Sequence, residues 1–138
     1  MSKAKVLLVE DKQSDVRLVQ EAFKILNIDV DFNAVYDGEE AVNYIFKKGK
    51  YSSAETPDIV IMDIKMPKKN GREVLKEIRE NDSTKDITVF MLTNSDAKED
   101  ILESYEYRAN SYMTKPLELS EFVEIIRYIN ETWLKKIN

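Results

Sequence analysis

The sequence lacks cysteine and histidine and has few residues that break regular structure. The absence of cysteine excludes disulfides, zinc thiolate sites and thiol catalysis. The absence of histidine excludes imidazole bases, histidine metal ligands and a role as a phosphohistidine carrier. Three glycines and three prolines leave little room for a flexible linker. Any chemistry in this chain therefore depends on carboxylates, hydroxyls, lysine, arginine and tyrosine.

The chain also lacks an excess of positive charge and a long hydrophobic run. Its 21 Lys and Arg against 26 Asp and Glu give a net charge of −5, which argues against nonspecific binding to nucleic acid. The first apolar run, Val6 to Val9, is too short for a signal-peptide core or a membrane span. We therefore expect a cytoplasmic protein that binds neither nucleic acid nor membrane.

Short apolar runs alternate with helical periods in a length that suits one domain. Runs at 6–9, 59–62 and 89–92 are apolar on both faces, as in buried parallel strands. Weaker candidates at 30–35 and 111–113 are expected to flank them. Helical periods follow these runs, near Ser14 (a candidate N-cap), Gly38, Gly71, Asp96 and Ser120. This pattern predicts an α/β fold with a five-stranded parallel sheet and helices on both faces, as one domain over 1–138.

The segment 47–57 has no clear period. It contains three lysines, a glycine and two serines. We interpret it as the end of the second helix followed by an exposed loop, and we favour a solvated connection over a binding site.

Polar residues stand where the predicted strands end, which is where open parallel sheets bind their ligands. These positions hold three carboxylates, a hydroxyl and an ammonium: Glu10, Asp11, Asp63, Thr93 and Lys115. Taken singly, the acids suit helix caps or turns, the threonine suits a strand end and the lysine suits the surface. Taken together, they predict one ligand site.

The residue types in this set narrow the ligand. Carboxylates that lie close together repel one another unless a cation lies between them. Oxygen ligands without histidine or cysteine favour Mg²⁺ or Mn²⁺ over zinc. A metal with an ammonium and a hydroxyl beside it suits a phosphoryl group, and a carboxylate is the likeliest nucleophile, as in aspartyl-phosphate chemistry.

Four stretches of the sequence, which span essentially the whole chain in order, resemble the receiver domain of two-component response regulators. They are 5–11, 57–67 with Asn70 and Gly71, 91–93 and 109–116. The resemblance implies a flavodoxin-like (βα)5 fold with strand order 2-1-3-4-5. It also implies a signalling switch that accepts a phosphoryl group from a sensor histidine kinase or a phosphotransfer protein. Such a domain is not an enzyme beyond catalysing its own phosphorylation and dephosphorylation, and we expect it to stand over 1–138 without an output domain.

The resemblance also implies a role for each acid at the site. Asp63 would be the phosphoryl acceptor. Asp11 and Asp63, together with the backbone carbonyl of Lys65, would bind Mg²⁺ directly, and Mn²⁺ could substitute. Glu10 would act mainly through a bound water.

Further positions complete the implied switch. Thr93 would donate a hydrogen bond to the phosphoryl group, Lys115 would pair with it, and Tyr112 would turn inward as Thr93 moves. The bond between Lys115 and Pro116 is cis in the family. Phosphorylation would shift an existing equilibrium that is read out on the face of the fourth helix, fifth strand and fifth helix. That face could bind a partner or form a homodimer.

The sequence departs from the family pattern at three places. Asn94 stands where a small residue is usual, and its amide is expected to slow exchange with small phosphodonors. Lys65 adds an ammonium near the site, which we interpret as a solvated side chain. The extra length in 47–57 is similar to that of single-domain receivers that resemble the partners of bacterial phytochromes, so a phytochrome-like kinase is a candidate partner.

Other functions remain as alternatives. A phosphatase of the haloacid-dehalogenase type would need a second acid at position 65, which is Lys65. A flavodoxin would need a first loop rich in Ser, Thr and Gly, where this chain has Glu10 and Asp11. A degenerate receiver that only binds partners is disfavoured because every site residue is present. A phosphate shuttle or sink in a multistep relay is the remaining alternative.

Overall fold

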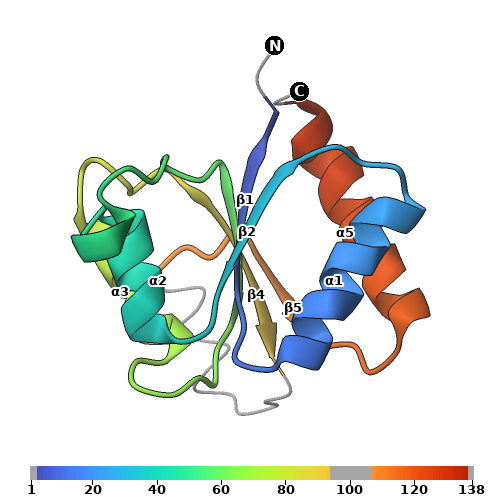
Figure 1. The fold of residues 1–138 in the computed structure, drawn as a ribbon, viewed down its shortest axis with the longest axis horizontal. Helices are drawn as coiled ribbons and strands as arrows, with labels where there is room; N and C mark the ends of the chain where they lie inside the picture. The colour runs from blue at the N-terminus through green and yellow to red at the C-terminus, as the bar shows by residue number, and fades with distance from the viewer. Residues whose placement is uncertain (1–2, 94–106, 137–138) are drawn as a thin grey trace.

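Within the residues that the structure describes, five parallel strands lie between two layers of helices (Figure 1). The structure is a computed structural model, and it describes residues 3–93 and 107–136. The strands are β1 (Lys5–Val9), β2 (Asp31–Val35), β3 (Ile59–Asp63), β4 (Thr88–Thr93) and β5 (Ser111–Thr114). The helices are α1 (Gln13–Ile25), α2 (Gly38–Ile45), α3 (Gly71–Glu80) and α5 (Leu119–Thr132), with short 3-10 turns η1 (Gly49–Tyr51) and η2 (Leu134–Lys136). The helix predicted near Asp96 lies outside the described residues, as does Asn94.

The strand order confirms the predicted topology. Across the sheet the strands run β2-β1-β3-β4-β5, and every neighbouring pair is parallel. Val9 at the end of β1 pairs with Val35 on one side and Met62 on the other. The two weaker strand candidates are the edge strands β2 and β5, as expected. The carboxyl ends of the central strands therefore lie side by side at one edge of the sheet.

The sheet is covered on both faces, which explains why its central strands are apolar throughout. α1 and α5 pack on one face, and α2 and α3 pack on the other (Figure 1). Successive side chains of β1 alternate between these layers: Leu8 enters the core under α1 and α5, whereas Leu7 and Val9 enter the core under α2 and α3. This confirms the interpretation of the apolar runs as buried parallel strands.

The helices begin by different means. Asp37 caps α2 by accepting a hydrogen bond from the Glu40 backbone at 2.7 Å, and Asn70 forms a capping box with α3. The prediction of Ser14 as the N-cap of α1 is wrong, because α1 begins at Gln13 after Lys12, without a side-chain cap. The Lys12 backbone N–H instead donates to the Glu10 carboxylate at 3.1 Å. No helix in the described ranges has both the length and the apolar character needed to cross a bilayer.

The segment 47–57 is partly structured and is not an extension of α2. The helix ends at Ile45, and Lys47 adopts a positive φ of 58°, which turns the chain out of the helix. The η1 turn then places Tyr51 against α2, where its hydroxyl donates to the Glu40 carboxylate at 2.9 Å. Its ring lies 5.2 Å from that of Tyr44, between centroids. The prediction that the second helix extends into this segment is therefore wrong.

The start of α2 is packed against the loop between β3 and α3. A Cβ atom added to Gly38 would lie 1.8 Å from the carbonyl oxygen of Lys69, so only glycine permits this approach. Lys68 Nζ, in the same loop, lies 3.8 Å from the Asp37 carboxylate. The contact joins the loop that follows Asp63 to the second helix.

Candidate acidic site

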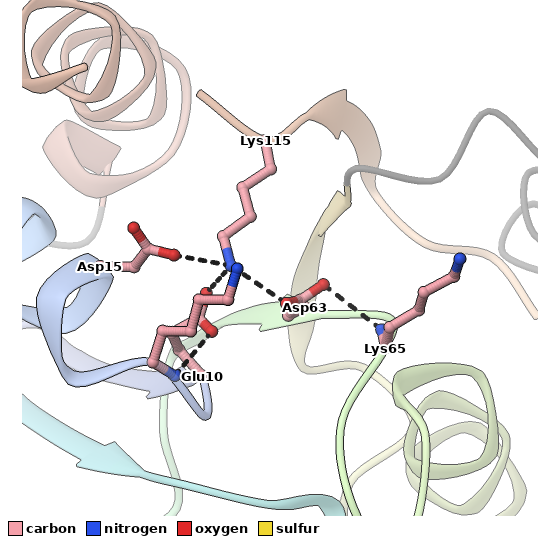
Figure 2. A network of polar contacts seen from close by, with 6 residues as sticks. Glu10, Asp15, Asp63, Lys65 and Lys115 are labelled. Carbon is pink, nitrogen blue, oxygen red and sulfur yellow. Dashed lines mark hydrogen bonds and ion pairs between the residues drawn. The ribbon is translucent and has the colours of Figure 1, made fainter. Parts of the chain in front are cut away.

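The described residues predicted at the strand ends lie together at the carboxyl edge of the sheet. Glu10 and Asp11 follow β1, Asp63 is the last residue of β3, and Lys115 follows β5. Figure 2 shows the side chains of Glu10, Asp63 and Lys115 pointing toward one another from these elements. The central position of β1 and β3 in the sheet brings about this convergence.

The ammonium of Lys115 is the centre of the cluster. Among the described residues it contacts three carboxylates: Glu10 at very short range, Asp15 at 2.9 Å and Asp63 at 3.1 Å (Figure 2). Only 5% of Lys115, 4% of Glu10 and 8% of Asp63 is exposed. Such charges are stable in the interior only when they are paired, and here one cation serves several anions.

The burial of these charges shifts their protonation. Burial raises the pKa of Glu10 to about 7, although its hydrogen bonds to Lys115 and Lys12 oppose the shift. Burial also raises the pKa of Asp63, against the opposing effect of Lys115. For Lys115 burial acts in the lowering direction, but hydrogen bonds to Glu10 and Asp15 leave its pKa above the ordinary value. The carboxylates thus outnumber the single ammonium, and a cation bound among them would favour their ionised forms.

The acids satisfy the geometry of a divalent-cation site. One carboxylate oxygen from each of Glu10, Asp11 and Asp63 lies within 4.8 Å of the others. Asp11 is exposed, whereas Glu10 and Asp63 are buried. A set of oxygen ligands with one solvent-facing member suits a hard cation such as Mg²⁺ or Mn²⁺, which keeps several of its waters. The residues present therefore fit the predicted metal.

The backbone around Asp63 is tightly fitted. A Cβ atom added to Gly71 would lie 2.5 Å from the carbonyl oxygen of Asp63, and the Gly71 N–H donates to the carbonyl of Ile64 at 2.7 Å. The Lys65 N–H lies 3.3 Å from an Asp63 carboxylate oxygen. The Lys65 side chain is exposed and extends away from the cluster in Figure 2, in agreement with its interpretation as solvated.

Two predicted switch positions lie on the neighbouring strands. Thr93 ends β4 and pairs with Thr114 in the sheet, beside the end of β3. Tyr112 pairs with Met91, is half-buried and packs against the core under α2 and α3. Both positions therefore lie in β4 and β5, the two strands next to Lys115 in the sheet. Their roles as switch residues stay predictions.

One expectation about the end of β5 is wrong. The described residues contain no cis peptide bond, so Lys115 and Pro116 are joined in the trans form. The trans form is the lower in free energy for an X-Pro bond, by about 0.5–1 kcal/mol. In this trans arrangement Lys115 reaches all three of its carboxylate partners.

Asp15 is the member of the Lys115 cluster that the sequence analysis missed. It lies in the first turn of α1. No sequence pattern marks it as part of the site, because an acid there suits the positive end of the helix dipole. No spacing rule linked it to Asp11, because Asp11 precedes α1 and residues four apart share a face only within a helix. The structure shows its carboxylate directed at Lys115 (Figure 2).

The strand order of the sheet and the acids at its edge agree with the protein family that the sequence matches. Residues 6–127 match the family described as the response regulator receiver domain, and the chain belongs to that family. It is thus a receiver domain of phosphorylation-dependent two-component signalling, and a phosphatase or flavodoxin identity is not supported.

The chain is similar to receivers associated with phytochromes. It is 38% identical to response regulator Rcp1 of Synechocystis sp. over 132 residues, covering 96% of this chain and 90% of that protein. The crystal structure of the phosphorylated cyanobacterial phytochrome response regulator RcpA matches with a TM-score of 0.91 and 40% identity, covering 99% of this chain and 96% of that one. The Mn²⁺-bound form of Rcp1 matches with a TM-score of 0.87 and 37% identity, covering 97% of each chain.

Proposed function

We propose that Asp63 accepts a phosphoryl group from a sensor histidine kinase while Glu10 and Asp11 help to hold a Mg²⁺ ion. The observation that supports this most is the position of the Asp63 carboxylate, which belongs to the acid cluster and also contacts Lys115 at 3.1 Å. It is buried yet lies at the open edge of the sheet, where a ligand can reach it.

The transfer follows from the groups present. An Asp63 oxygen attacks the phosphorus, the bond to the kinase imidazole nitrogen breaks, and that nitrogen leaves with the electron pair. Mg²⁺, when held by Asp11, Asp63 and the Lys65 carbonyl directly and by Glu10 through a water, would neutralise charge on the phosphoryl oxygens. The Lys115 ammonium pairs with one of these oxygens, and the Thr93 hydroxyl donates to another. The chain catalyses this step and the later hydrolysis, and no other reaction.

The phosphorylated state is read out at the surface formed around β5 and α5. Tyr112 turns inward as Thr93 moves toward the phosphoryl group, and the altered face binds a partner or a second copy of the chain. A single receiver domain over 1–138 would signal in this way in the cytoplasm, without binding nucleic acid. A phosphate shuttle is less favoured, because the similar proteins Rcp1 and RcpA are response regulators.

The cognate kinase is proposed to be phytochrome-like. Rcp1 and RcpA support this, because RcpA is a phytochrome response regulator and the two match nearly the whole chain. The red-light response regulator RPA3017 of R. palustris is also similar, with a TM-score of 0.86 and 30% identity.

A labelling experiment tests the acceptor. The chain is incubated with a radiolabelled phytochrome-type histidine kinase and Mg²⁺, and the label on the chain is then counted. Because the chain has no histidine, label on it that neutral hydroxylamine releases reports acyl phosphate. We expect Asp63→Asn to lower labelling more than about a hundredfold, since the nucleophile is lost.

The matched control is Asp82→Asn, which removes a carboxylate whose side chain is fully exposed and lies 3.7 Å from Lys85. It should label like the unaltered chain. Equal labelling of Asp63→Asn and the unaltered chain would contradict the assignment of Asp63.

A further inference from the structure

The ammonium of Lys115 uses all of its hydrogen-bonding capacity within the acidic site. A lysine ammonium carries three donors. Among residues 3–93 and 107–136, its partners are Glu10, Asp15 and Asp63, which is one carboxylate for each donor. The side chain of Lys115 is 3% exposed, so water has little access to it. A change at one of these carboxylates therefore changes how the ammonium is shared by the others.

The three carboxylates differ in one respect. Glu10 and Asp63 belong to the set whose oxygens can surround a metal, whereas Asp15 does not. Asp15 comes from the first turn of α1 and its side chain is 18% exposed. A divalent cation bound to Glu10 and Asp63 repels the ammonium from them. The Asp15 carboxylate then remains as the anion that can keep the ammonium in the site.

We propose that Asp15 is a positioning residue that acts through Lys115: it holds the ammonium when the metal is bound and competes for it with the phosphoryl group. This inference rests on the proposed function of Asp63. The two effects have opposite signs. Asp15 favours the cation, because it draws the competing ammonium away from the metal ligands. It disfavours the phosphoryl group, because it retains part of the ammonium that would pair with it.

The test is Asp15→Asn, which keeps the size of the side chain and an oxygen acceptor but removes the charge. Binding of Mn²⁺ alone is measured by electron paramagnetic resonance of the free ion. We expect its dissociation constant to rise about three- to tenfold, as for one unit charge lost near a partly screened site. Binding of beryllofluoride, a mimic of the phosphoryl group, is measured by calorimetry at saturating Mg²⁺. Its dissociation constant should fall by about threefold or more, because Lys115 is released to pair with it.

A Lys115→Met background separates action through the lysine from a direct effect of charge. In that background we expect Asp15→Asn to change Mn²⁺ affinity by less than about twofold, as a double-mutant cycle requires when one residue acts through the other. Asp82→Asn is the matched control, since it removes an exposed carboxylate that pairs with Lys85, and it should change neither affinity.

Three outcomes would overturn the inference. Weakening of both ligands by Asp15→Asn would indicate a purely structural role. Affinities within about twofold of the unaltered chain would show that Asp15 has no role in positioning. An unreduced effect on Mn²⁺ in the Lys115→Met background would show that its charge acts through space. Failure of the unaltered chain to bind beryllofluoride with Mg²⁺ would instead contradict the proposed function of Asp63.

Discussion

Two cationic side chains, one near each end of β5, contact acceptors of different kinds. Lys115 follows the strand and contacts three charged carboxylates. Arg79, at the end of α3, contacts neutral oxygens of the segments that precede β4 and β5, with distances of 2.7–3.3 Å. Its acceptors are the backbone carbonyls of Lys85, Ile87, Tyr107 and Arg108 and the side-chain oxygen of Asn110.

The difference shows which contacts can respond to a ligand. A metal or a phosphoryl group alters the charges around Lys115, so the ammonium can be redistributed among its partners. Carbonyl oxygens cannot be protonated near neutral pH or taken by a metal bound at the other end of the strand. Arg79 therefore holds the segment before β5 through contacts that a ligand bound beyond the other end of the strand would leave unchanged.

The largest effect on stability is expected at Arg79. Arg79→Met removes every hydrogen bond of the guanidinium and leaves the half-buried carbonyl of Ile87 without this donor. The free energy of unfolding should fall by about 2–4 kcal/mol, measured by urea denaturation.

The affinity of Arg79→Met for Mn²⁺ should match that of the unaltered chain. Arg79→Lys is the companion variant, and it should recover only part of the loss because a point charge cannot span these acceptors. A large loss of metal affinity in either variant would break the separation between the two cationic clusters.

A smaller effect is expected from pH at the Lys115 cluster. Because the folded state raises the pKa of Glu10 to about 7, it binds a proton more tightly than the unfolded chain does. This contribution to stability is complete below the unfolded pKa, near 4.3, and is lost as pH rises through about 7. We expect a loss of about 1–3 kcal/mol over this window in metal-free protein, followed by urea denaturation.

Glu10→Gln is the control for this pH dependence. It cannot titrate at position 10, so its stability should fall less over the same window. Saturating Mg²⁺ should also flatten the curve of the unaltered chain, because a bound cation favours the ionised carboxylate. An identical slope in Glu10→Gln would assign the dependence to other groups.

The smallest effect is expected from giving the Arg79 cluster a charge. The Oδ1 atom of Asn110 accepts hydrogen bonds from the Val89 backbone at 2.8 Å and from Arg79 at 3.1 Å, and Asn110→Asp retains this acceptor oxygen. Because the residue is exposed, the free energy of unfolding should change by less than about 1 kcal/mol.

The difference in free energy of unfolding between Asn110→Asp and the unaltered chain should also shrink in 1 M salt, because salt screens an exposed charge. A large change in stability that does not depend on salt would mean that the substitution acts by something other than the charge of the acceptor. It would contradict the comparison of the two clusters by acceptor charge.

The sequence predicted those parts of the molecule that leave a periodic or positional pattern. Apolar runs revealed the buried strands, and the rule that ligands bind beyond strand ends located Glu10, Asp63 and Lys115. Arg79 could not be found in this way, because its partners are mainly backbone carbonyls, which every residue type supplies. Asp15 was missed because an acid in the first turn of a helix has an ordinary explanation.

The two wrong predictions of helix ends each have a local cause. Ser14 suits a cap by its type, but the Glu10 carboxylate already binds the backbone N–H before the helix. The extension of the second helix into 47–57 failed because the backbone turns at Lys47. In both places a local backbone feature that residue type alone does not reveal decided where the helix begins or ends.

The two close backbone approaches at Gly38 and Gly71 limit how this scaffold can be redesigned. Both glycines pack against the segment 63–70, which leads from Asp63 to α3. A methyl group at either glycine would collide with the backbone of this segment. Engineers who wish to retarget the protein should leave these two positions untouched and place diversity in the surface turn around Gly49, where an added Cβ meets nothing within 4 Å. At Gly49 itself the positive φ of 58° still argues for keeping glycine or using asparagine.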